Sequence, residues 1–159
     1  MIPTIAALTG ADEAFNHQIF NTFAAVGTAD RAWTEKAWFT LMRKDGSLQV
    51  SLGLGKYANR NIVDGFAGVQ TGTRQMTVRA SRMLSADPDT MNVGTIGYEV
   101  IEPLKAIRLT LGENTAQPLR FDLTFTATMP AFFENRDVVI QSGRAASDVI
   151  RFHQAGTVS

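Results

Sequence analysis

The sequence contains no cysteine and only two histidines, His17 and His153. Without cysteine there is no disulfide framework and no thiolate metal site, which fits a reducing compartment, so we expect the protein in the cytoplasm. Neither histidine stands in a His-x-x-x-His or Glu-x-x-His spacing. We therefore expect no zinc or iron site and no cofactor.

The chain also lacks an excess of charge of either sign, because 15 lysines and arginines balance 15 aspartates and glutamates. A protein without net charge has no overall field that attracts it to nucleic acid or to an anionic membrane. No run of 18 apolar residues occurs, and the apolar stretch in residues 1–10 lacks a basic region. We expect neither a membrane-spanning segment nor a signal peptide.

Sequence motifs of nucleotide-binding and hydrolytic sites are missing as well. Residues 53–61, GLGKYANRN, contain Gly-x-Gly-Lys without the rest of a phosphate-binding loop, and they lie between two expected strands. We interpret them as a turn. The sequence has no Gly-x-Ser-x-Gly motif, so it gives no support to nucleophilic hydrolysis.

The 159 residues are enough for one domain, preceded by a segment of different character. In residues 1–30, Phe15, Ile19 and Phe23 recur at helical spacing and Asp12 can cap a helix, which predicts a short N-terminal helix within an otherwise irregular segment. From residue 31 to residue 159 we expect a β domain, because the apolar period changes to two.

Alternating apolar and polar residues predict a series of antiparallel strands joined by hairpins. The strongest turn signal is Asp45-Gly46. The expected strands are 33–43, 48–55, 61–70, 74–84, 91–102, 104–112 and 119–129, with a further strand in 150–159. Such a meander is typical of an up-and-down barrel or a strongly curled sheet, and a sandwich of two sheets is the alternative.

Aromatic residues and one aspartate in the first three strands are the candidates for ligand binding. If they point inward, they line an apolar pocket of the kind that a barrel of about eight strands can hold. If no ligand exists, the same aromatic side chains fill the core. The candidate ligand-binding residues are Trp33, Trp38, Phe39, Tyr57, Asp64 and Phe66.

Glu35 is the candidate catalytic residue, because it shares one face of its strand with Trp33 and Phe39. Desolvation by these aromatics would keep the carboxyl protonated and able to donate a proton. Alternatively, an arginine neutralises Glu35, or Glu35 lies at the solvent-exposed rim. The candidate partner arginines are Arg79, Arg82 and Arg108.

A set of short motifs resembles the N-terminal lobe of the lipocalin-like AttH and carotenoid hydratase superfamily. They are the Trp-x-Glu strand at 33–35, the Asp-Gly hairpin, the Gly-Leu-Gly and Asn-Arg-Asn corner at 53–61, and the closing arginine-aromatic-His-Gln-x-Gly at 151–156. The resemblance covers most of residues 31–159. It implies a lipocalin-like barrel, usually two in tandem, and acid-assisted hydration or cyclisation of an apolar polyene or terpenoid without a redox cofactor.

The chain ends where the resemblance places the start of a second lobe, so it is either a fragment or a relative with a single lobe. Three functions remain open: a carrier or binding lobe for a hydrophobic small molecule, an acid-catalysed hydratase or cyclase lobe, and a structural or oligomerising domain. In the enzyme, Glu35 would donate the proton and Trp33 or Trp38 would stabilise a developing cation. Exposed strand edges would favour a homodimer or pairing with the second lobe.

Overall fold

The computed structural model describes residues 8–13, 30–84, 91–134 and 137–159. These residues form antiparallel β strands together with two 3-10 turns, η1 (Gly10–Glu13) and η2 (Ala58–Arg60). The expected helix carrying Phe15, Ile19 and Phe23 lies outside the described residues. Among the residues described, no helix has the length and apolar character needed to cross a membrane.

The first sheet consists of four consecutive antiparallel strands, β1 (Glu35–Met42), β2 (Gln49–Tyr57), β3 (Ile62–Thr71) and β4 (Arg74–Met83), in the order β1-β2-β3-β4. The Asp45-Gly46 turn joins β1 to β2, as the sequence predicts. Oδ1 of Asp45 accepts hydrogen bonds from the backbone and the hydroxyl of Ser47, at 3.0 and 2.7 Å, and Gly46 adopts a φ of 71° that favours glycine.

The second sheet has the order β12-β7-β6-β5 and is also antiparallel. Two small two-stranded sheets follow β7 in the chain and lead to β12. The strands of the second sheet are β5 (Ile96–Glu102), β6 (Ala106–Leu111), β7 (Phe121–Ala127) and β12 (Gly156–Val158), and those of the small sheets are β8 (Phe132–Phe133) with β11 (Phe152–His153) and β9 (Asp137–Gln141) with β10 (Arg144–Val149).

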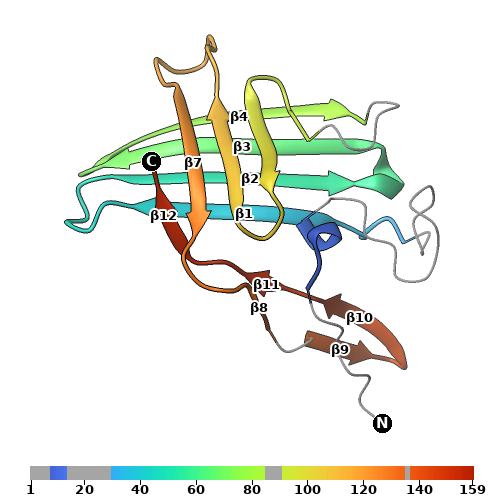
Figure 1. The fold of residues 1–159 in the computed structure, drawn as a ribbon. Coiled ribbons are helices and arrows are strands. Elements are labelled where there is room, and N and C mark those ends of the chain that lie inside the picture. The colour runs from blue at the N-terminus through green and yellow to red at the C-terminus, as the bar shows by residue number, and fades with distance from the viewer. Residues whose placement is uncertain (1–7, 14–29, 85–90, 135–136) are drawn as a thin grey trace.

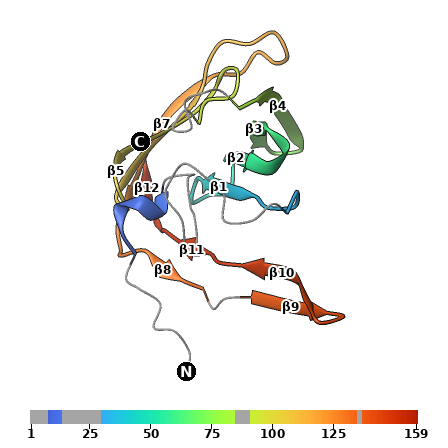
Figure 2. The ribbon, with the colours of Figure 1, turned by 90° about the vertical axis from the view of Figure 1, so that its right-hand side faces the viewer.

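The two four-stranded sheets lie face to face, and the strands of the second run across those of the first (Figures 1 and 2). Between them lies an apolar core to which both sheets contribute. Its most deeply buried large side chains are Leu52, Val63, Val93, Ile96, Ile107, Leu109 and Leu111. Alternation places those that lie within strands on the inner faces, and Val93 joins them from the turn before β5. Burial of one face of each sheet therefore holds the layers together.

The antiparallel all-β prediction is confirmed, but the strands described do not close into a barrel or form one strongly curled sheet. No hydrogen-bonded ladder joins β4 to β5 or β1 to β12 among the described strands. Before β5 the chain reverses in a tight turn, where Val93 pairs with Ile96 and Gly94 adopts a φ of 61°. A new sheet therefore starts there, and the arrangement corresponds to the two-sheet alternative.

The turn η1 is anchored to the second sheet by Glu13, which is only 3% exposed. Its carboxylate accepts hydrogen bonds from the backbone N–H of Leu104, at 2.6 Å, and from Nε2 of Gln154. The hydroxyl of Tyr98 donates to the backbone carbonyl of Glu13, at 3.3 Å. The Glu13 clasp, as we call these four residues, joins the N-terminal segment to β5, the β5–β6 turn and the segment before β12.

An arm formed by β9 and β10 extends away from the two large sheets (Figures 1 and 2). Every residue of β9 is exposed, including the three consecutive apolar residues Val138, Val139 and Ile140. An isolated two-stranded sheet is marginally stable by itself, and exposed apolar strands favour association.

Candidate functional site

The first sheet has two faces of different chemistry, which follow from alternation along its strands. In β1, the side chains of Glu35, Ala37, Phe39 and Leu41 are half-buried, whereas every second residue between them is exposed. We call the face toward the second sheet the inner face and the opposite one the outer face. The outer face is open to solvent, and the candidate site lies on it.

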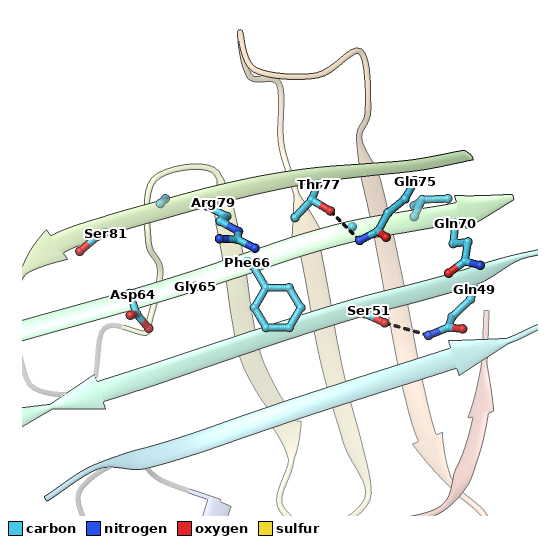
Figure 3. Close-up of a pocket in the computed structure, with 13 residues that line it drawn as sticks. Gln49, Ser51, Asp64, Gly65, Phe66, Gln70, Gln75, Thr77, Arg79 and Ser81 are labelled. Carbon is cyan, nitrogen blue, oxygen red and sulfur yellow. Dashed lines mark hydrogen bonds between the residues drawn. The ribbon is translucent and has the colours of Figure 1, made fainter. Parts of the chain in front are cut away.

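The outer face contains a pocket of about 600 Å³, lined by residues of β2, β3 and β4. Its polar side chains come from all three strands, and the ring of Phe66 lies among them (Figure 3). This volume lies within the range of small-molecule sites. The side chains that line it include Gln49, Ser51, Asp64, Phe66, Gln75, Thr77 and Arg79.

Glycines of β2 and β3 form the floor of this face. Gly53 is directly opposite Phe66 in the strand register, and the Phe66 ring occupies the space that a Cβ at Gly53 would need. A Cβ at Gly55 would lie 3.0 Å from Oδ1 of Asp64. Gly68 leaves room in the same way beside Thr77. The missing side chains lower the surface, and the Phe66 ring rests on the backbone of β2.

Two glutamine side chains are held in place along the strands. Nε2 of Gln75 donates to Oγ1 of Thr77 at 3.2 Å, and Nε2 of Gln49 donates to Oγ of Ser51 at 3.3 Å (Figure 3). In each bond the amide nitrogen serves as donor, so the carbonyl oxygen of the same amide keeps its acceptor capacity. Fixed orientation of such groups reduces the entropy that ligand binding would otherwise cost.

Tyr57 and Asp64 interact at the end of the outer face near η2. Burial raises the pKa of the Tyr57 hydroxyl, and the negative charge and hydrogen bond of Asp64 raise that pKa further. Nζ of Lys36 and Cζ of Arg60 each lie 5.7 Å from the centre of the Tyr57 ring, within the range of a cation–π contact. Asp64 is thereby fixed at the border of the pocket.

One row across the outer face combines aromatic, small and cationic residues. Trp38, Gly53, Phe66 and Arg79 stand directly opposite one another on β1, β2, β3 and β4. Trp38 is 66% exposed, and Arg79 is exposed as well. Two aromatic side chains thus flank a glycine, and an arginine completes the row.

The residues that the sequence groups into one pocket are divided between the faces of the first sheet. Trp38, Tyr57, Asp64 and Phe66 belong to the outer face, and the last two line the pocket. Phe39 is on the inner face, where its ring centre lies 5.9 Å from that of Tyr98. The half-buried Trp33 precedes β1 and donates its backbone N–H to the carbonyl of Asp30, at 3.1 Å.

Glu35 lies on the inner face directly opposite Lys56, which is only 7% exposed. Of the arginines considered as its partners, Arg79 is on the outer face, and Arg108 makes a two-bond contact with Asp122, at 2.8 and 2.7 Å. Arg82 donates to the backbone carbonyl of Asn92 at 2.8 Å. The register therefore places a lysine closest to Glu35 in the ladder.

Of the polar side chains of the pocket, Asp64 was predicted from the sequence as a ligand-binding residue, whereas the hydroxyl and amide side chains were not. Gln49, Ser51, Gln75 and Thr77 occupy the polar positions of two alternating strands, which is also where ordinary solvent-exposed residues stand. The neighbouring in-strand glycines were a usable signal, because a glycine within a strand often marks a close approach of another group.

A second group of ionisable residues lies between β8 and β11. Glu134 binds Nε2 of His153 at 2.7 Å and Nε of Arg151 at 2.7 Å, and the His153 ring stacks on Phe132 with centres 5.2 Å apart. The His153 hydrogen bond, together with the nearby Arg151 guanidinium, holds the pKa of Glu134 below its usual range. In the described part of the chain, no three His, Asp or Glu side chains are grouped so that they could hold a metal ion.

A family model, that of the family of unknown function DUF8625, matches residues 8–159, and the chain belongs to this family. The match covers all four described segments, so both large sheets and the arm lie within the residues that the family model matches. No curated protein matches the chain. No solved structure matches it either.

Proposed function

We propose that this member of DUF8625 is a ligand-binding module and that its ligand occupies the pocket on the outer face of the first sheet. The observation that carries the proposal is the pocket itself, about 600 Å³ in volume and lined by polar side chains around the ring of Phe66. Concave sites of this size, with a few oriented polar groups, are the usual places of small-molecule binding.

The ligand that fits this pocket has both apolar and polar parts. The Phe66 ring provides apolar surface, while Asp64, Arg79 and the two glutamines provide charges and amides. A wholly apolar ligand would remove these polar groups from water without replacing their hydrogen bonds, which costs free energy for each group. We therefore favour an amphipathic ligand over the purely hydrophobic one that the sequence suggests.

A site between the sheets, as a lipocalin-like carrier of hydrophobic ligands requires, has less support. Leu52, Ile107 and Leu109 are each 1% exposed and fill the space between the layers. A ligand there would have to displace packed side chains or separate the sheets.

The hydratase or cyclase alternative depends on Glu35 as a proton donor. In the ladder, Glu35 stands directly opposite the buried Lys56, where the two residues can form a cross-strand pair of opposite charge. This position suits a structural charge pair better than an acid that must stay protonated. A binding module, acting as a carrier or as one lobe of a larger protein, is therefore our preferred function.

The proposal is tested by screening a fragment library by ligand-observed NMR against the wild type and two alanine variants. Phe66→Ala removes the pocket ring, and Phe132→Ala removes an exposed ring between β8 and β11 and serves as the control. We expect fragments whose signals attenuate with the wild type and Phe132→Ala but not with Phe66→Ala. A library without hits, or hits insensitive to Phe66, would rule out the pocket as the binding site.

A further inference from the structure

We infer that the ligand of the outer face is a neutral oligosaccharide, one ring of which stacks on Phe66 while its hydroxyls bind the polar side chains around it. This inference rests on the proposed function, since it names the ligand class of the same pocket. A sugar ring has C–H groups on its faces and hydroxyls at its edge. It is therefore complementary to an aromatic face surrounded by amides, carboxylates and guanidinium groups.

The Phe66 ring is placed as a stacking platform. One face covers Gly53 on β2, where no side chain intervenes. Figure 3 shows the ring viewed onto its other face, lying over the neighbouring strand with the polar side chains around it. The glycine therefore turns an aromatic residue that would otherwise stand upright on the sheet into a flat surface accessible to a ligand.

Polar side chains surround this platform with both donors and acceptors. Arg79, directly opposite Phe66, carries donors only, and Asp64, two residues before Phe66, is an acceptor. Gln75 and Thr77 add an amide and a hydroxyl that are already hydrogen-bonded to each other. Hydroxyl groups both donate and accept, so they satisfy all of these groups, whereas an aliphatic chain satisfies none.

The charges and the extent of the site indicate a neutral ligand longer than one sugar ring. Asp64 and Arg79 are the charged side chains among the residues lining the pocket, one of each sign. The lining residues of β3 extend from Asp64 to Gln70, about 20 Å along an extended strand. Trp38 lies two strands from Phe66 in the same row, about 10 Å away, and offers a second exposed aromatic surface.

The experiment titrates cellotetraose, xylotetraose, mannotetraose and chitotetraose into the 15N-labelled protein and measures affinity by calorimetry. We expect at least one of them to bind, with chemical-shift changes at Gln75, Thr77 and Arg79. Phe66→Ala and Arg79→Ala should each weaken that affinity at least tenfold. The matched controls Phe132→Ala and Arg120→Ala remove exposed residues elsewhere and should change it less than twofold. Because Arg79 is exposed, its variant keeps the test valid if Phe66→Ala fails to fold.

Binding of the fluorescent amphiphile anilinonaphthalene sulfonate distinguishes a failure of the saccharide inference from a failure of the proposed binding function. If it shifts the pocket resonances while all four tetrasaccharides fail, the pocket binds ligands but the saccharide inference is wrong. If neither the amphiphile, the fragments nor the saccharides shift these resonances, both the inference and the proposed function fail. Saccharide binding that leaves Gln75, Thr77 and Arg79 unchanged also contradicts the inference.

Discussion

Phe66 on β3 lies with its ring over Gly53, the residue directly opposite it on β2. The ring occupies the position that any larger residue at 53 would need for its Cβ. The flat aromatic surface of the outer face therefore depends on a residue of the neighbouring strand that itself contributes no side chain.

Gly53→Ala should displace the Phe66 ring and disturb the pocket. We expect a loss of stability of about 1–3 kcal/mol from overpacking, together with loss of ligand binding. Gly112→Ala is the matched control, because a Cβ at Gly112 would have no atom closer than 3.6 Å. Urea denaturation of the three proteins measures the effect. A Gly53→Ala variant as stable as Gly112→Ala would show that the ring relocates without cost.

Lys56 and Glu35 should depend on each other for stability. Removing one charge of a buried or half-buried opposite-charge pair leaves the other poorly solvated, so Lys56→Met and Glu35→Gln should each cost about 1–3 kcal/mol. The double variant should cost less than the sum of the two. A double-mutant cycle by chemical denaturation measures the coupling, and strictly additive effects would mean that the two side chains do not interact.

Glu13→Ala should destabilise the protein because it removes both carboxylate acceptors of the clasp. The N–H of Leu104 and the amide of Gln154 would lose their partner, at a cost of about 2–4 kcal/mol. Glu113→Ala, at a residue whose side chain is 86% exposed, should change stability by less than about 0.5 kcal/mol. Thermal denaturation of both variants suffices. If Glu13→Ala and Glu113→Ala had the same melting temperature, the clasp would not contribute to stability.

The Arg108–Asp122 pair predicts an acid-dependent loss of stability. The Arg108 hydrogen bond lowers the pKa of Asp122 in the folded protein below its ordinary value, so the unfolded chain binds the proton more readily. The pair therefore stabilises the fold fully at neutral pH, and the contribution disappears as the pH falls from about 4 through the lower folded pKa. The melting temperatures of wild type and Asp122→Asn should differ at pH 7 and converge as the pH falls well below about 4, the ordinary pKa of aspartate. A constant difference would contradict the linkage.

The apolar arm should promote self-association. Val138, Val139 and Ile140 are exposed on β9, so Val139→Lys should reduce association at high protein concentration without lowering the melting temperature. Thr115→Lys introduces the same charge at an exposed loop position. Sedimentation velocity compares the three proteins. Unchanged association in Val139→Lys would exclude the arm as the contact surface.

Local patterns sufficed for the strands up to β7 and for the first hairpin, because alternation and the Asp45-Gly46 turn act over a few residues, but they did not predict the β9–β10 hairpin. They were not sufficient to decide between barrel and sandwich. Alternation is the same in both, and the decision depends on whether β4 pairs with β5, a contact that no local pattern encodes.

The site shows the same division between local and long-range information. Asp64 and Phe66 are two residues apart on β3, so alternation along the strand places both side chains on one face. The structure brings them together in the pocket. Alternation alone does not say which face of a strand is buried. From the sequence, Trp38 and Phe39 were therefore assigned to one pocket, although as neighbours in β1 they point to opposite faces of the sheet. Lys56 was not considered beside Glu35, because the residue that stands opposite Glu35 depends on the register of β1 and β2.

The Glu13 clasp has a consequence for how the chain folds. Glu13 and Gln154 are separated by 141 positions, so their hydrogen bond closes a loop of nearly the whole chain. Contacts of such long range form late, after the local hairpins, because closing a long loop costs conformational entropy before any interaction compensates for it. Interactions absent from the transition state act mainly on the rate of unfolding. The clasp should therefore govern how long a folded molecule persists more than how fast it is made.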